Sequence, residues 1–260
     1  MKGLIIAGGC GKRLGDKTLR INKCMLFVNG RRLIEYSLEN AYKYVDELLI
    51  VVGYVSDQII NTYGNQYKGI KISYVFQEEQ RGLVHAIQCA QGKISNEKFM
   101  LFLGDEIIIN PKHQNMLEKY MFENCFCVCG VVKVEDKSLI TDTYSILSDS
   151  ENSILELIEK PEEPFNYLMG TGNCILSDRF FSYIDDTPIS PLFKERLLTD
   201  VIQTAIKNGE CAKWNMIGSD YFNINKPSDI SRAEALLRTN GNKVSSGRYY
   251  GEEDNKYTTV

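Results

Sequence analysis

The 260-residue chain lacks features that mark several classes of protein. It has no apolar run near the roughly 18 to 20 residues of a membrane span, and its start lacks the charged, apolar and small-residue segments of a signal peptide. It has no excess of positive charge, with 30 Lys and Arg residues against 34 Asp and Glu residues. Bulk affinity for nucleic acid or anionic membranes is therefore excluded. These absences predict a soluble, cytoplasmic protein with no nucleic-acid partner and no membrane association.

Ligands for a transition metal are also scarce. The chain has two histidines, and its eight cysteines form no C-x-x-C pair. Cys125, Cys127 and Cys129 alternate along one apolar segment, and this spacing predicts a buried strand with all three thiols on one face. A chain of this length needs no disulfide staples. The cysteines are therefore interpreted as core residues rather than as a metal site or a disulfide framework.

The chain does contain short apolar runs that alternate with helix-length periodic segments. The predicted strands are "GLIIAGG" (3–9), "ELLIVVG" (47–53), "IKISYVF" (70–76) and "KFMLFLGD" (98–105). The predicted helices between them lie near 31–45, 56–64 and 83–91. Further helices are predicted near 198–208 and from Pro227 onward. This order predicts an α/β fold, with a mostly parallel, Rossmann-like sheet flanked by helices and ligands beyond the carboxyl ends of the strands.

A glycine-rich stretch follows the first predicted strand. It consists of Ile6, Ala7, Gly8, Gly9, Cys10, Gly11, Lys12 and Arg13. It is not a P-loop, because Arg13 stands where a hydroxyl is needed, nor a dinucleotide fingerprint, because Leu14 replaces the third glycine. Glycines allow backbone N–H groups to form an anion-binding nest, with the two cations facing the same phosphates. A tight turn followed by ordinary surface cations explains the stretch equally well.

The segments that follow resemble, in order, the signature of the sugar-1-phosphate nucleotidyltransferases of the glucose-1-phosphate thymidylyl- and uridylyltransferase type. They are "GGCGKRL", "NKCML", "QEEQRGLVHA", "FLGDEI", "LIEKP", "LLTD" and "YFNINKPSDI", the last being similar to W-x-D-x-G-T-P-x-D. The resemblance extends over roughly residues 2 to 238. Any one of these segments alone is weak, but their shared order is specific.

The resemblance implies a nucleotidyltransferase fold and a domain organisation. A single domain would span residues 1–240, with a nucleotide-binding part over about 1–135. A smaller strand-and-loop sugar-binding part and a closing helix would occupy about 136–240, and residues 241–260 would form a polar tail. The implied reaction is attack by a sugar-1-phosphate oxygen on the α-phosphate of a nucleoside triphosphate, with release of pyrophosphate.

The resemblance also assigns catalytic roles to Arg13, Lys23 and Asp105. Arg13 would hold the triphosphate, and Lys23 would hold the α-phosphate together with the incoming phosphate. Asp105 ends an apolar strand at the carboxyl edge of the sheet, where the implied cofactor, Mg²⁺, would bridge phosphates. The family's second metal ligand is an aspartate, whereas this chain has Asn223. An amide oxygen can bind Mg²⁺ but brings no negative charge.

The resemblance implies that Gln77 and Gly82 bind the nucleotide together with the glycine-rich stretch, and that they contact the base. The Gln lies five residues before the Gly, a spacing that family members use to read uracil or thymine, so UTP or dTTP is favoured. A side-chain amide can flip to suit cytosine. A CTP-dependent enzyme acting on a sugar phosphate, another phosphate or a phosphonate therefore stays open as an alternative.

The candidate acceptor contacts are Ser145, Glu159, Lys160 and Gly172. Glu159 would accept sugar hydroxyl hydrogens and Lys160 would hold the sugar phosphate, while Ser145 stands where thymidylyltransferase-like members carry glycine. The acceptor is left open. Two other classes also stay open: a catalytically silent nucleotide-sugar-binding regulatory protein, favoured by Asn223 alone, and a glycosyltransferase with a related fold. Family members often assemble, so the state of the chain as a monomer or homo-oligomer is open too.

Overall fold

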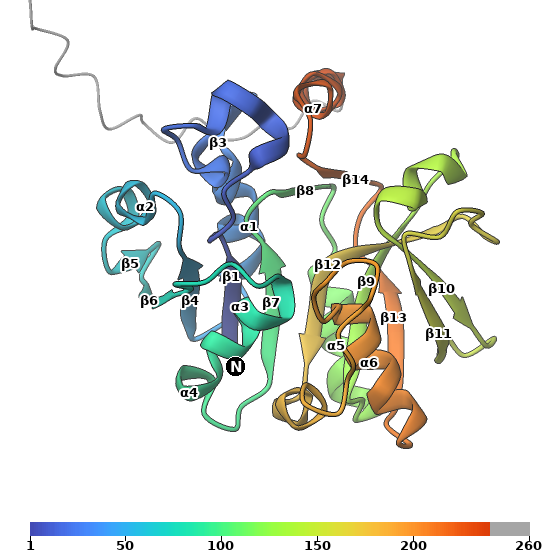
Figure 1. The fold of residues 1–260 in the computed structure, drawn as a ribbon. Coiled ribbons are helices and arrows are strands. Elements are labelled where there is room, and N and C mark those ends of the chain that lie inside the picture. Colours follow the sequence, from blue (N-terminus) through green and yellow to red (C-terminus); the bar gives the residue numbers. More distant parts are fainter. Residues whose placement is uncertain (240–260) are drawn as a thin grey trace, which may run out of the picture.

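The computed structural model describes residues 1–239, and the polar tail predicted over residues 241–260 lies outside them (Figure 1). At the centre, four parallel strands lie side by side in the order β7 (Phe99–Leu103), β1 (Lys2–Ile6), β4 (Glu47–Val52) and β6 (Ile70–Phe76). The side chains of β7, β1 and β4 are buried on both faces of the sheet, which is why these three segments read as continuous apolar runs, whereas β6 is only partly buried. The predicted α/β fold with a mostly parallel central sheet is confirmed.

The sheet has ten strands, and its other half is mixed. Strand β12 (Leu168–Leu176) runs antiparallel to β7 and to β9 (Cys127–Lys133), and β13 (Ala212–Met216) pairs with β9 in parallel. Strands β10 (Tyr144–Ser148) and β11 (Ile154–Glu159) form an antiparallel arm beside β12, and the short β5 (Gln66–Tyr67) lies at the opposite edge. This arm extends the sheet beyond its parallel core.

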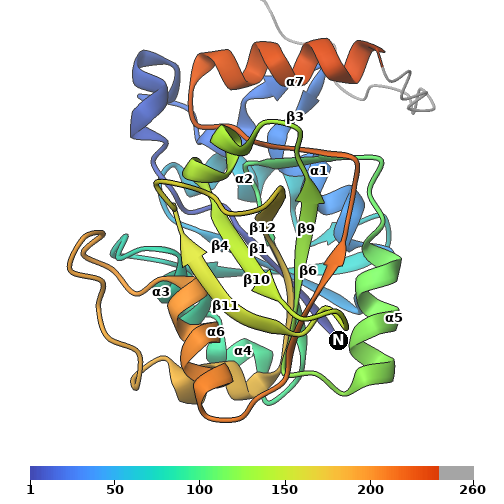
Figure 2. The same cartoon turned by 90° about the vertical axis from the view of Figure 1, so that its right-hand side faces the viewer.

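Helices cover both faces of the sheet (Figure 2). One face packs against α1 (Leu33–Ala41), α2 (Ser56–Tyr63) and α5 (His113–Glu123). The other packs against α3 (Leu83–Cys89), α4 (Gln91–Ile94) and α6 (Leu198–Lys207). Four 3₁₀ helices connect these elements: η1 (Lys12–Thr18), η2 (Lys23–Met25), η3 (Lys137–Asp142) and η4 (Asp178–Tyr183). The predicted helices near 31–45, 56–64, 83–91 and 198–208 are confirmed, although the third divides at Ala90.

A small third layer lies beyond the carboxyl ends of the parallel strands (Figure 1). Its two-stranded sheet pairs β8 (Glu106–Ile109) with β14 (Asp220–Asn223), and the hairpin of β2 (Phe27–Val28) and β3 (Arg31–Arg32) lies nearby. Helix α7 (Pro227–Thr239) packs on both through Ala233 and Leu237. Pro227 occupies the first helical position, where its missing N–H costs nothing. This layer brings the C-terminal segment over the end of β7.

The prediction that Cys125, Cys127 and Cys129 share one face is wrong for Cys125. Strand β9 begins at Cys127, so the alternation of the strand does not extend back to Cys125. Cys127 and Cys129 lie with Cys174 in one core cluster, whereas Cys125 lies in the opposite cluster, 3.8 Å from the sulfur of Cys211. Within residues 1–239, the helices are all too short or too polar to cross a bilayer.

Candidate active site

The glycine-rich loop runs across the carboxyl ends of β1 and β4. A Cβ atom added at Gly53 would lie 2.9 Å from the Gly8 carbonyl oxygen, so the two strand ends approach closely only because Gly53 has no side chain. Gly11 has φ +59° and turns the chain into η1. Its carbonyl accepts a hydrogen bond of 2.9 Å from the Thr18 hydroxyl, and an added Cβ would lie 3.0 Å from the Lys23 Cβ. The loop is thus held against Lys23.

The loop residues divide by position. Those that line a cavity of about 540 Å³ in the cleft are Ile6, Ala7, Gly9, Lys12 and Arg13. Gly11 lines a smaller adjoining cavity with Lys12, Lys23 and Asn225. Cys10 lines neither cavity, and its sulfur lies 2.7 Å from the Gln80 side-chain oxygen. The structure therefore brings most of the predicted loop residues to the cleft but turns Cys10 toward Gln80.

A buried asparagine fixes the segment that carries Lys23. Asn22 is fully buried, and its Nδ2 donates to the carbonyl oxygens of Ala7 at 3.0 Å and Tyr54 at 2.8 Å. Its Oδ1 accepts from the backbone N–H of Cys24 at 2.8 Å. One amide therefore ties the end of β1, the segment after β4 and the start of η2 together. A residue this constrained holds the lysine beside it at the bottom of the cleft.

Lys23, Asp105 and Asn225 form a charged cluster where three segments meet. Lys23 is 7% exposed, and its Nζ lies 2.6 Å from Asp105 Oδ2 and donates to Asn225 Oδ1 at 2.9 Å. Asp105 follows β7, while Asn225 lies between β14 and α7. The three residues span 202 positions of sequence. The structure therefore brings together the predicted Lys23 and Asp105 and adds Asn225.

Oxygen donors collect at the same point. Asn223 ends β14, and its Oδ1 is buried without a hydrogen-bond partner within residues 1–239. Asp105 and Asn225 also present side-chain oxygens, both bonded to the ammonium of Lys23. Hard divalent cations prefer carboxylate and carbonyl oxygen ligands. This set fits Mg²⁺, with one carboxylate and two neutral amide oxygens.

Gln77 lines the same cavity of about 540 Å³ as the glycine-rich loop. This residue is 5% exposed, and its Nε2 donates to the Gly82 carbonyl at 3.1 Å and lies 3.1 Å from His85 Nδ1. Its Oε1 has no hydrogen-bond partner within residues 1–239, and it lies 3.1 Å from the point where Gly8 would carry a Cβ. Burial and the neighbouring Arg81 guanidinium lower the pKa of His85, which keeps the imidazole neutral near pH 7. Gln77 thus presents an acceptor toward the cleft.

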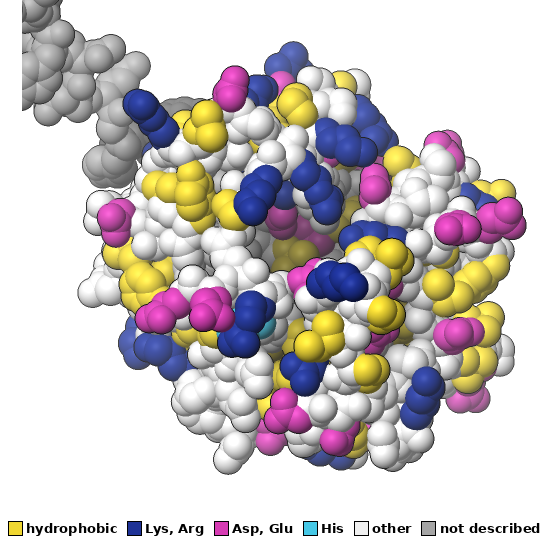
Figure 3. Space-filling model, in the orientation of Figure 1, with side chains coloured by type: hydrophobic (Ala, Val, Ile, Leu, Met, Phe, Trp, Pro, Cys, Tyr) yellow, Lys and Arg dark blue, Asp and Glu magenta, His cyan; other side chains and the backbone are white. Residues whose placement is uncertain are grey.

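Two cavities join to form the cleft, which appears as the hollow in the middle of the face in Figure 3, with Lys and Arg side chains around acidic ones. The first, of about 540 Å³, contains the loop, Gln77, Gly82, Lys23 and Asp105. The second, of about 220 Å³, contains Glu159, Lys160, Gly172 and Asn223. Residues that line both are Arg13, Leu83, Leu103 and Glu195. A ligand in one cavity can therefore meet a ligand in the other beside Arg13.

The second cavity holds two of the predicted acceptor contacts in a usable form. Glu159 accepts a hydrogen bond of 3.2 Å from the Thr199 hydroxyl, and burial raises the pKa of its carboxyl while Lys160 lowers it. Lys160 Nζ lies 4.0 Å from the Glu159 carboxylate and 4.6 Å from the ring centre of Phe193. Ser145 is fully buried and lines neither cavity, and its hydroxyl has no hydrogen-bond partner in the described part of the chain. The structure thus does not bring the Ser145 side chain to either cavity.

Sequence reasoning missed Glu106. This carboxylate is 2% exposed and accepts hydrogen bonds from Gly172 N–H at 2.9 Å, Asn173 Nδ2 at 2.7 Å and the Tyr221 hydroxyl at 2.6 Å. Burial raises the pKa of Glu106 to about 8. Gly172 lines the cavity, but its N–H is already bonded to this carboxylate. The available signal was an acid directly after Asp105, in a segment that is otherwise apolar.

A glycine-rich loop, a buried lysine and a cluster of oxygen ligands, all at the carboxyl ends of parallel strands, define a nucleotide-binding α/β protein. The sequence profile of the nucleotidyl transferase family matches residues 2–241, and the chain belongs to that family.

Curated relatives agree with this assignment. From Haloferax volcanii, the UTP–glucose-1-phosphate uridylyltransferase AglF is 28% identical over 92% of this chain and 97% of its own length. The low-salt glycan biosynthesis nucleotidyltransferase Agl11 of the same organism is 27% identical over 91% of this chain. The bifunctional protein GlmU of Methanocaldococcus jannaschii is 28% identical over 91%. The chain spans 66% of Agl11 and 54% of GlmU, so both relatives contain further segments.

Solved structures share the fold. A UDP-glucose pyrophosphorylase complexed with UDP-glucose superimposes with a TM-score of 0.79 at 23% identity, covering 92% of this chain and 98% of that one. A UTP-bound UGPase from Acinetobacter baumannii gives a TM-score of 0.80 at 18% identity, covering 93% and 94%. At these identities the likeness concerns the fold alone.

Proposed function

We propose that the protein transfers a nucleotidyl group from UTP or dTTP to a sugar-1-phosphate, giving a nucleoside diphosphate sugar and pyrophosphate. The observation that carries this proposal is the cluster of Lys23, Asp105 and Asn225 at the junction of two cavities. One cavity has a base-reading end at Gln77, and the other has a sugar-type end at Glu159. Family membership and the relative AglF, which matches over nearly its whole length, support the same reaction.

The proposed chemistry is an in-line displacement that needs no covalent nucleophile. An oxygen of the sugar phosphate attacks the α-phosphorus, the bond from that phosphorus to the bridging oxygen breaks, and pyrophosphate leaves. Lys23 neutralises the two phosphates that approach each other, and Arg13 holds the departing charge. Asp105, Asn223 and Asn225 would hold Mg²⁺, which neutralises phosphate charge when bound. The cleft thus supplies position and positive charge to reactants that are both anions.

The base preference rests on the orientation of Gln77. Its Nε2 is occupied by the Gly82 carbonyl, so Oε1 is left to accept a hydrogen bond from the base. Uracil and thymine carry an N3–H that can donate to this oxygen. Cytosine has no hydrogen at N3, and on this edge only its 4-amino group can donate. This arrangement supports UTP or dTTP over CTP, which stays the alternative to be measured.

The test is pyrophosphate release with Mg²⁺ across UTP, dTTP, CTP, GTP and ATP, each paired with several sugar-1-phosphates, phosphocholine and a phosphonate. Release that is confined to UTP or dTTP with a sugar-1-phosphate is the expected result. Release with CTP alone would show that the enzyme uses cytosine rather than uracil or thymine. Binding of a triphosphate without release in any pairing would instead favour a silent regulatory protein, in which the neutral Asn223 no longer supports turnover.

A further inference from the structure

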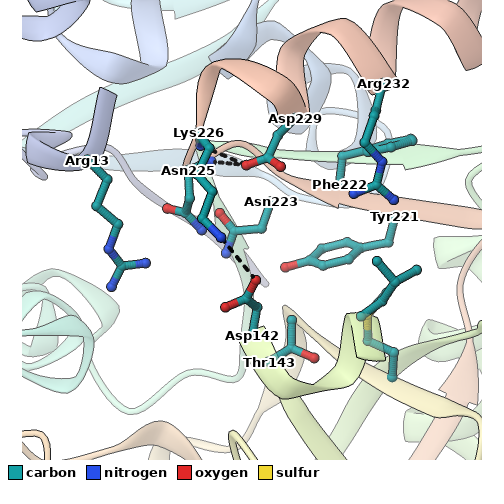
Figure 4. Close-up of a pocket in the computed structure, with 12 residues that line it drawn as sticks. Arg13, Asp142, Thr143, Tyr221, Phe222, Asn223, Asn225, Lys226, Asp229 and Arg232 are labelled. Carbon is teal, nitrogen blue, oxygen red and sulfur yellow. Dashed lines mark hydrogen bonds and ion pairs between the residues drawn. The ribbon is translucent and has the colours of Figure 1, made fainter. Parts of the chain in front are cut away.

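A small cavity opens where α7 begins, beside the acceptor end of the cleft (Figure 4). Its volume is about 70 Å³, and it lies between η3, β14 and the first residues of α7. Residues that line both this cavity and the acceptor cavity are Arg13, Asp142, Thr143, Tyr221, Asn223 and Asn225. Only Arg13 and Asn225 also line the small cavity at the glycine loop. The space is therefore an extension of the acceptor side rather than of the triphosphate loop.

Lys226 adds positive charge to this extension, which Arg13 and Arg232 also line. Figure 4 shows its side chain passing beside Asn223 and Asn225 toward Asp142, with Arg13 across the cavity. Its Nζ lies 3.8 Å from Asp142 Oδ2, and the two side chains are 61% and 73% exposed. An ion pair this long and this exposed contributes little stability and is easily exchanged for another anion. The ammonium is thus available to a ligand.

The backbone around Lys226 is fixed even though its side chain is exposed. Asp229 accepts hydrogen bonds from the backbone N–H groups of Asn225 at 2.9 Å and Lys226 at 2.7 Å. These bonds hold the first turn of α7 in the manner of a capping residue. They fix the position of the Lys226 backbone, and so the point from which its side chain extends into the cavity.

Two other lysines of the cleft, Lys23 and Lys160, have less exposed side chains than Lys226. Lys23 is held by Asp105 at 2.6 Å, and Lys160 lies over the Phe193 ring beside Glu159. The acceptor cavity is also lined by Glu159 and Glu195, whose carboxylates repel a phosphate dianion. Relative to the W-x-D-x-G-T-P pattern, this chain loses a carboxylate at Asn223 and gains an ammonium at Lys226. Both changes make the same small region more positive.

We propose that Lys226 binds the phosphate group of the acceptor and releases Asp142 as it does so. Its ammonium then supplies positive charge where the neutral Asn223 would hold a metal ion less tightly than an aspartate. The inference rests on the proposed function, because it assumes an acceptor that carries a phosphate. It assigns a binding role to a residue of the α7 start, which the sequence resemblance does not select.

The experiment is an NMR titration of the metal-free full chain, in EDTA, with glucose-1-phosphate and separately with inorganic pyrophosphate. Lys226→Thr should weaken glucose-1-phosphate binding about tenfold, the size expected for one charge-assisted contact, and should change pyrophosphate binding much less. The matched control is Lys137→Thr, which removes the same charge from η3, where Lys137 lies over Tyr167 and outside the cavity. The control should bind both anions like the wild type. Asp142→Asn should strengthen glucose-1-phosphate binding, since it frees the ammonium.

Three outcomes would overturn the inference: a Lys226→Thr variant that binds glucose-1-phosphate like the wild type, a loss confined to pyrophosphate, or a wild type that binds no glucose-1-phosphate. Measurements of turnover distinguish a failure of the role of Lys226 from a failure of the proposed function. If the wild type releases pyrophosphate with a sugar-1-phosphate and Lys226→Thr leaves its KM unchanged, only the role of Lys226 fails. If no pairing gives turnover but glucose-1-phosphate binding still depends on Lys226, only the reaction fails.

Discussion

At the residue scale, Lys23 is the side chain on which the charge arrangement of the cleft depends. Lys23→Ala should lower kcat/KM by at least about 100-fold, because it removes the cation placed between the two reacting phosphates. Steady-state pyrophosphate release measures this. Lys119→Ala is the matched control, since Lys119 forms an ion pair with Glu123 at 2.9 Å on α5, away from the cleft. Equal activity in the two variants would contradict the assigned role.

Substitution of Gln77 tests whether this side chain recognises the base of the triphosphate. In Gln77→Leu the side chain keeps its bulk but loses both the oxygen facing the cleft and the amide that bonds to Gly82. We expect kcat/KM for UTP to fall about 100-fold, because the N3–H of the base then has no acceptor. The preference for UTP over CTP should shrink as well. Gln91→Leu, at an exposed position in α4, should leave both values unchanged. A uniform loss with UTP and CTP would indicate that Gln77 only supports the loop.

At the element scale, strand β12 accommodates the ring of Tyr144 only because residue 170 is glycine. A Cβ at Gly170 would lie 2.1 Å from a ring atom of Tyr144, whose hydroxyl donates to the Thr171 carbonyl in the core. Gly170→Ala should therefore destabilise the protein by about 2 kcal/mol through overpacking. The same change at Gly92 in α4 meets nothing within 4 Å and should stabilise by about 0.5 kcal/mol. Urea unfolding measures both values, and losses of equal size would contradict the packing argument.

The elements also show what the sequence can and cannot predict. The parallel strands were predictable because a strand buried on both faces is apolar throughout, as in "LLIVV" of β4. The position of Asp105 followed from the end of such a strand. Asn225 and Tyr221 did not follow, because they meet Lys23 and Glu106 across 202 and 115 residues, and no local periodicity encodes that pairing. The burial of Ser145 away from both cavities did not follow either, because a motif position does not reveal which way a side chain points.

At the scale of the whole molecule, a buried polar chain crosses from α5 to the acceptor cavity. His113 Nε2 lies 2.8 Å from Asn173 Oδ1, Asn173 Nδ2 donates to Glu106, and Glu106 accepts from Tyr221. His113 is 1% exposed, and since Asn173 uses its amide hydrogens on Glu106, its oxygen must accept from the imidazole. The chain thus joins α5, β12, β8 and β14, which makes the shape of the acceptor cavity depend on an intact core.

This burial makes global stability depend on pH through His113. Burial lowers the pKa of His113 from 6.5 to about 4, so the imidazole is neutral in the fold but gains a proton in the unfolded chain below pH 6.5. Its contribution is present above pH 6.5 and is lost as pH falls toward 4, a loss of about 2 kcal/mol between pH 7 and pH 5. Glu106 acts in the opposite direction, because its raised pKa favours the fold as pH falls, but it does so in wild type and variant alike. Urea unfolding of metal-free protein at both pH values should therefore show a drop about 2 kcal/mol smaller in His113→Gln, whose side chain does not titrate. Equal drops in the two proteins would mean that His113 is already protonated in the folded state at pH 5.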